Sequence, residues 1–112
     1  MNVRLYVWQR ATAAVMAPLI VVHLVVIFWA TRRGVSAADV LARTRGSIAW
    51  ALYYGTFVVA AAVHGAIGVR GVLREWAPRT IARRERVLDV AMWGFGALLM
   101  LLGLRAVAAV VL

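Results

Sequence analysis

The sequence predicts an all-α membrane protein with three transmembrane helices that run up, down and up again. Of its 112 residues, 65% are hydrophobic and 15% are charged, whereas soluble domains average roughly 45–50% and about 25%. Three stretches each reach the length of about 20 apolar residues that a helix needs to cross a bilayer. So short a chain cannot wrap a core around this much apolar sequence, which excludes a soluble globular domain.

The first apolar stretch covers residues 11–30 and contains no charged residue. Tyr6 and Trp8 lie just before it, and Phe28 and Trp29 lie at its end, as expected of aromatic side chains at the two membrane interfaces. These limits predict a helix over residues 6–31. We expect it to remain in the mature protein, because its apolar run is longer than that of a signal peptide and no small-residue cleavage site precedes the following arginines.

The second and third stretches cover residues 46–69 and 90–112, and they predict helices over 46–73 and 87–111. Arg105 interrupts only the third, and it lies near enough to the end to extend towards the lipid headgroups. Ser36 and Asp39 have the spacing of a helix-capping box, which predicts a short interfacial helix over 36–44. Residues 1–112 therefore form a single membrane domain.

Arginine accounts for all thirteen basic residues and gives a formal net charge of +9. Such a charge can indicate nucleic-acid binding, but these arginines lie between the apolar stretches, where the positive-inside rule explains them. We expect membrane lipid and no nucleic acid as a partner. The side with the N-terminus and the second loop holds eight arginines against five, which predicts a multi-pass protein of the inner (cytoplasmic) membrane with a cytoplasmic N-terminus.

Two histidines, His23 and His64, lie within the predicted spans, and the chain has no cysteine to supply thiolate ligands. An ionisable side chain within a membrane is costly and indicates a function. Neutral imidazole is the usual axial ligand of haem iron, and a hydrogen bond between helices is the alternative. His64 shares its helix face with small residues that suit either a flat macrocycle or close helix packing; these are Ala60, Ala61, Gly68 and Gly71.

The two histidines are expected at different depths. Each lies about five residues past the middle of its span, and the two spans run in opposite directions, so roughly 15 Å separates them along the membrane normal. One iron cannot bind both, and each would need a second ligand from another chain. Around the first helix, Gln9 and Thr12 lie within about 40° of His23, whereas Arg10 lies about 140° away.

Two motifs resemble those of the membrane-anchor cytochrome b subunits of succinate dehydrogenases and fumarate reductases. The stretch Gln9-Arg10-Ala11-Thr12-Ala13 is similar to the family's His-Arg-x-Ser/Thr-Gly, with glutamine and alanine in place of histidine and glycine. The stretch His64-x3-Gly68-x-Arg70 is similar to the family's haem-ligand motif. The three-helix layout and the length match over essentially the whole chain. The spacing from Gln9 to His23 also resembles that of anchors that bind two haems.

The resemblance implies an anchor chain that forms half of a six-helix bundle in the respiratory chain and tricarboxylic acid cycle. Electrons would pass from a flavoprotein subunit, which oxidises the dicarboxylate, through an iron–sulfur subunit to ubiquinone or menaquinone. Haem b, with two haems in the anchor dimer, would be bound by His64 and His23. The second three-helix anchor would be a distinct chain or an identical one. The implied quinone-binding residues are Arg10, Tyr6 and Gln9, and the implied haem-packing residues are Gly68, Gly71, Ala61 and Arg70.

Two other functions remain open from the residues: a small transporter or channel subunit that uses the histidines to handle protons or substrate, and a structural anchor without haem. The first two spans contain no carboxylate, which counts against a proton relay. As an isolated chain the protein is not expected to carry the dicarboxylate chemistry. The sequence leaves open the quinone, the dicarboxylate and the direction of electron flow.

Overall fold

The computed structural model describes residues 2–112 and confirms the all-α class. Three long helices make up most of this range: α1 (Val3–Arg33), α3 (Ile48–Trp76) and α5 (Glu85–Val111). Two short helices, α2 (Ala37–Thr44) and α4 (Arg79–Ala82), connect them. Each long helix is long and apolar enough to cross a membrane.

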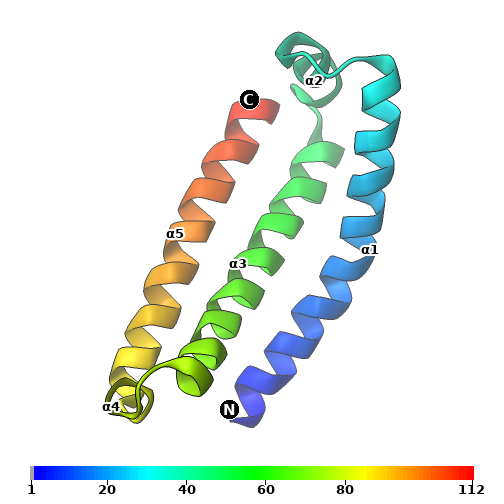
Figure 1. The fold of residues 1–112 in the computed structure, drawn as a ribbon. Coiled ribbons are helices and arrows are strands. Elements are labelled where there is room, and N and C mark those ends of the chain that lie inside the picture. The colour runs from blue at the N-terminus through cyan, green and yellow to red at the C-terminus, as the bar shows by residue number, and fades with distance from the viewer. Residues whose placement is uncertain (1) are drawn as a thin grey trace.

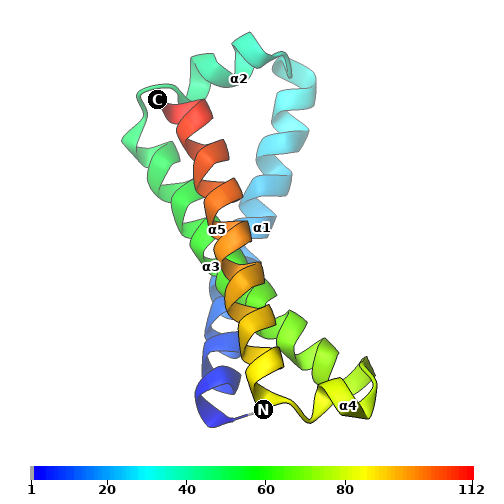
Figure 2. The same cartoon turned by 90° about the vertical axis from the view of Figure 1, so that its left-hand side faces the viewer.

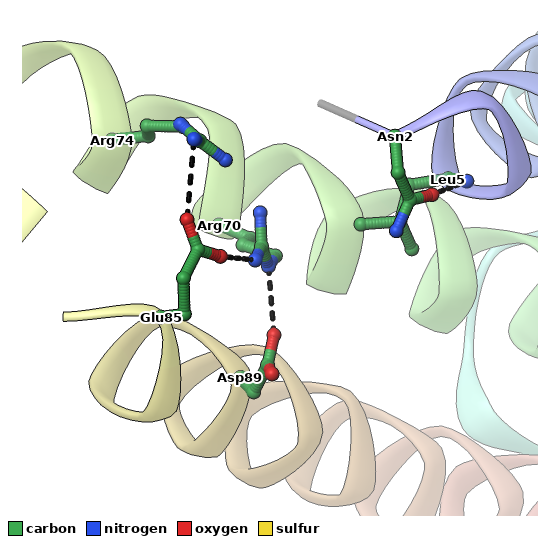
Figure 3. Close-up of polar contacts among 6 residues, drawn as sticks. All are labelled: Asn2, Leu5, Arg70, Arg74, Glu85 and Asp89. Carbon is green, nitrogen blue, oxygen red and sulfur yellow. Dashed lines mark hydrogen bonds and ion pairs between the residues drawn. The ribbon is translucent and has the colours of Figure 1, made fainter. Parts of the chain in front are cut away.

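Helix α1 extends beyond its apolar stretch at both ends, and α3 and α5 extend beyond theirs on the side of α4. The start of α3, at Ile48, lies two residues after the predicted start. Asn2 lengthens α1 towards the N-terminus, because its side chain accepts a hydrogen bond of 2.9 Å from the backbone N–H of Leu5 (Figure 3). Ser47 caps α3 in the same way through the N–H of Trp50. The helix α4 was not predicted. Pro78 precedes it with a φ of −52°, close to the value that proline imposes and that suits entry into a helix.

The predicted capping box begins α2. The Ser36 hydroxyl accepts from the backbone N–H of Asp39 at 3.1 Å, and the Asp39 carboxylate accepts from the backbone N–H of Ser36 at 3.1 Å. Its hydrogen bonds with the side chain and backbone of Ser36 hold the pKa of Asp39 below the ordinary value. Gly34, which precedes the box with a φ of +148°, provides a turn that L side chains rarely adopt.

The central helix is α3, with α1 on one side and α5 on the other (Figure 1). The N-terminus and α4 lie at one end of the molecule, and α2 and the C-terminus lie at the other. The molecule measures 51 Å along its longest axis. Figure 2 shows that α2 bridges the gap between the end of α1 and the start of α3. The contact between α3 and α5 is much more extensive than that between α1 and α3.

Small residues allow α3 and α5 to pack closely. A Cβ atom added to Gly96 would lie 3.0 Å from the Cβ of Ala66, and one added to Gly103 would lie 2.5 Å from Cγ1 of Val58. Between helices in a bilayer, attraction depends on such close packing because lipid removes the hydrophobic driving force. The glycines of α5 therefore set the distance between the two helices.

An ion-pair cluster joins α3 and α5 at the α4 end (Figure 3). Arg70 is buried, with 6% of its surface exposed. Its Nε donates to Asp89 at 2.9 Å, and its Nη2 donates to Glu85. The Nη2 of Arg74 lies 3.1 Å from Glu85. Both carboxylates are on α5, so the cluster holds the two helices together beside the turn that connects them.

Replacing Gly103 with alanine is expected to destabilise the protein by about 1–3 kcal/mol, because the stiff, β-branched Val58 blocks the new methyl group. The measurement is reversible unfolding in detergent. Gly94→Ala is the matched control, because a Cβ there meets no atom within 4 Å; it should be neutral or slightly stabilising. In the Gly103→Ala background, Val58→Ala should restore part of the loss. Equal effects of Gly103→Ala and Gly94→Ala would contradict the packing argument.

Candidate functional site

The candidate site is centred on His64, which α3 presents to α1. Its Nδ1 lies 3.3 Å from the hydroxyl oxygen of Thr12. Thr12 is buried, and its hydroxyl also lies 2.8 Å from the carbonyl oxygen of Trp8 and 3.1 Å from that of Gln9. A hydroxyl on the α1 surface is thus held between its own helix and the imidazole of the next.

These distances select the tautomer of His64. A hydroxyl has one hydrogen to donate, and the backbone carbonyls of α1 are the closer acceptors. We therefore expect the hydroxyl oxygen to accept from Nδ1–H, which would leave the lone pair of Nε2 free. Histidines that bind metals use the same arrangement, with one ring nitrogen donating to a neighbouring acceptor and the other coordinating. His64 is therefore suited to coordinate an iron through Nε2.

His23 has an aromatic environment. Its ring meets those of Tyr54 and Phe57 edge-on, with centroids 6.1 and 5.8 Å away. Its Nδ1 is buried and has no hydrogen-bond partner among residues 2–112. The ring borders an open cavity of about 340 Å³ lined by residues of α1, α2, α3 and α5, which include Thr44, Val58, Gly103 and Val107. This nitrogen is therefore free to bond to a group that the chain itself does not supply.

The two histidines lie at different levels of the helix bundle. His64 contacts α1 at Thr12, eleven residues before His23, and His23 contacts α3 at Phe57, seven residues before His64. At 1.5 Å per helical residue these separations correspond to about 16 and about 10 Å. The structure therefore agrees with the depth estimate from the sequence, and one metal ion cannot reach both imidazoles of the same chain.

The residues expected at a quinone divide between two faces of α1. Gln9 turns towards α3, where its Nε2 would lie 3.6 Å from a Cβ on Gly68 and its Oε1 is buried without a partner. Arg10 and Tyr6 are exposed, and they share a face because they are four residues apart. The prediction that Thr12 and Gln9 lie on the His23 side of α1, away from Arg10, is confirmed. Gln9 is not brought together with Arg10.

The residues expected beside the haem have different surroundings. Gly68 faces Gln9 of α1, and Ala61 and Gly71 are half-buried. Arg70 binds the carboxylates of α5 and is thus engaged in holding two helices together. Its guanidinium faces a different helix from the imidazole of His64.

Sequence reasoning missed two contacts of the histidines. Fifty-two residues separate Thr12 from His64, and no local pattern links them. The aromatic surroundings of His23 did leave a signal, because the aromatic residues that open α3 recur at helical spacing on one face; they are Trp50, Tyr53, Tyr54 and Phe57. Tyr53 also donates its hydroxyl to the backbone carbonyl of Leu19, which fastens this cluster to α1.

No protein-family model matches the chain, and neither a curated protein nor a solved structure is significantly similar to it. The chemistry of the site therefore follows from its own residues. Two imidazoles in an apolar setting can each provide one neutral nitrogen ligand. On the outer surface of α1, a guanidinium and a phenol can donate hydrogen bonds to an oxygen-bearing ligand.

Replacing Thr12 with valine should weaken the preference of His64 for the Nδ1–H tautomer. We expect the fraction of the Nδ1–H form in the purified, haem-free chain to fall, with the ratio of the two tautomers changing about fivefold for a hydrogen bond of ordinary strength. Nitrogen-15 NMR of the imidazole measures this ratio in detergent. Thr12→Ser is the matched control and should retain the wild-type ratio, and the His23 resonances should not change. An unchanged His64 ratio in the Thr12→Val variant would refute the assignment.

Proposed function

We propose that this chain is a haem b-binding membrane anchor of a succinate:quinone oxidoreductase or fumarate reductase. The observation that carries the proposal is the hydrogen bond between Thr12 and Nδ1 of His64, which leaves Nε2 available as an axial ligand. The resemblance of the segment from His64 to Arg70 to the family's haem-ligand motif supports it. A bound haem would carry single electrons between the iron–sulfur subunit and the membrane quinone.

In this function the residues around His64 position the ligand. Thr12 holds the imidazole in one orientation and one tautomer, and the hydrogen bond that it accepts makes the coordinating nitrogen more basic. Because α1 and α3 surround both groups with apolar helix surface, the bond lies in a medium of low polarity, where it orients the ring more strongly than in water.

His23 provides the second ligand, for a different haem at the other level. Its position supports a dimeric anchor, because a two-fold axis along the membrane normal keeps each residue at its own depth. A second three-helix chain, identical or distinct, would then supply one histidine level with His23 and another level with His64. Together the two chains would make the six-helix bundle.

Arg10 and Tyr6 form the candidate quinone contact on the exposed face of α1. A guanidinium that donates to a quinone oxygen stabilises the negative charge that develops there on reduction. The end of the molecule that contains α4 and the N-terminus also holds the larger group of arginines, which favours a cytoplasmic position for it in the inner membrane. The flavoprotein and iron–sulfur subunits would dock at this end.

Replacing His64 with alanine should remove one haem from the purified complex, and replacing His23 should remove the other. In each variant about half of the reduced b-type absorption should remain, while the chain still inserts into the membrane. Visible spectroscopy and a haem-to-protein ratio measure the loss. A full haem complement in the His64→Ala variant would exclude this ligand. A complete absence of haem from the wild-type complex would favour a structural anchor or a transporter subunit.

Replacing Arg10 with alanine should lower quinone reduction by about ten- to a hundredfold, because a hydrogen bond to a developing charge is lost. Electron transfer from succinate to a soluble artificial acceptor should stay unchanged, since it bypasses the membrane. Arg4→Ala, which removes an exposed arginine near the same end of α1, is the matched control. Equal loss in both assays would instead indicate that the soluble subunits no longer dock.

A further inference from the structure

Four exposed arginines lie in and around α4 and have no side-chain partner within residues 2–112. Arg79, Arg83, Arg84 and Arg86 are all exposed, and we refer to them as the arginine face. Within residues 2–112 none of them makes an ion pair, a side-chain hydrogen bond or a contact with an aromatic ring. Four like charges in eight residues repel one another unless a counter-charge is bound.

The carboxylates that could neutralise this face are engaged elsewhere. Glu85 and Asp89 belong to the same segment, but both bind the buried Arg70, and Glu85 also binds Arg74 (Figure 3). Glu75, at the end of α3, contacts none of the four arginines. The ion-pair cluster therefore commits Glu85 and Asp89 to the arginines of α3, and no carboxylate among the described residues forms an ion pair with the arginine face.

At the opposite end of the molecule, three arginines contact aromatic rings of the same chain. The guanidinium of Arg32 lies 4.7 Å from the ring centre of Phe28, and those of Arg33 and Arg43 lie 5.8 and 5.3 Å from that of Trp29. These cation–π contacts provide a partner within the chain. Among the described residues, three of the arginines at this end therefore have an aromatic partner, whereas none of the four arginines of the arginine face has one.

Apolar side chains place the arginine face at a membrane interface. Trp76, at the end of α3, exposes 83% of its surface, and Ile81 of α4 exposes 40%. Exposed tryptophan at the end of a membrane-spanning helix is typical of the headgroup level. Arginine binds phosphate in a bidentate manner through its planar guanidinium. We propose that the arginine face binds the phosphate groups of anionic lipids, with Trp76 and Ile81 inserted beside them.

The neighbouring apolar side chains favour lipid over an acidic protein surface, because a lipid offers its phosphate and its acyl chains at adjacent depths. This inference does not depend on haem binding. Each arginine near an anionic bilayer contributes roughly a fivefold gain in affinity. Removing all four should therefore abolish most of the preference for anionic lipid.

Native mass spectrometry of the full chain in detergent, with phosphatidylglycerol and phosphatidylcholine of the same acyl chains, tests the proposal. The wild type should retain phosphatidylglycerol preferentially. Changing the four arginines of the face to glutamine should lower that preference by at least about tenfold. The matched control, in which Arg32, Arg33, Arg45 and Arg105 become glutamine, has the same change in charge at the other end, and its preference should remain within about twofold of the wild type.

Three results would overturn the proposal. The first is equal retention of the two lipids by the wild type. The second is an equal loss in the control variant, which would reduce the effect to net charge. The third is an unchanged lipid preference in the arginine-face variant together with loss of a soluble acidic subunit from the complex, which would assign the face to protein docking.

Discussion

In a bilayer, helices gain little from contact with one another unless they pack closely or exchange polar groups, because lipid solvates their apolar surfaces equally well. The arrangement of this protein depends on that constraint. Glycine and alanine bring α5 against α3, and the buried Arg70 joins them at one end. Between α1 and α3 the polar contacts are those of Thr12 with His64 and of Tyr53 with the carbonyl of Leu19. Among the described residues, the buried polar or charged side chains are Thr12, Thr44 and Arg70, and each of them bonds to another helix.

Because few polar side chains lie between the helices, the candidate site and the helix packing share residues. The contact that fastens α1 to α3 also determines which nitrogen of His64 carries the proton. Arg70 shows the opposite case, because both of its carboxylate contacts serve the α3–α5 interface. A buried charged residue can thus be committed entirely to helix packing, while an uncharged threonine contacts the imidazole of another helix.

The sequence predicted the parts of the structure that depend on local physics. Hydropathy located the long helices, the Ser36 and Asp39 spacing located the start of α2, and the angle of 100° per residue separated Arg10 from Gln9. Pairings between helices could not be predicted, because periodicity identifies the apolar or polar face of one helix and not the residue that it meets on another. Thr12 with His64 and Arg70 with Asp89 are such cases. The short helix α4 is too short to show a hydrophobic period that would predict it, although Pro78 is well suited to precede a helix.

Helix α3 has a more extensive interface with α5 than with α1, which affects the order in which the helices can assemble. Helices α3 and α5 are adjacent in the chain, connected by a short turn, and joined by both glycine packing and an ion-pair cluster. They can associate as a hairpin without α1. The ligand environment of His64, in contrast, is incomplete until α1 supplies Thr12. A nascent chain would therefore pass through a stage with two associated helices and an unoriented imidazole, and docking of α1 would be the step that completes the polar surroundings of that ring.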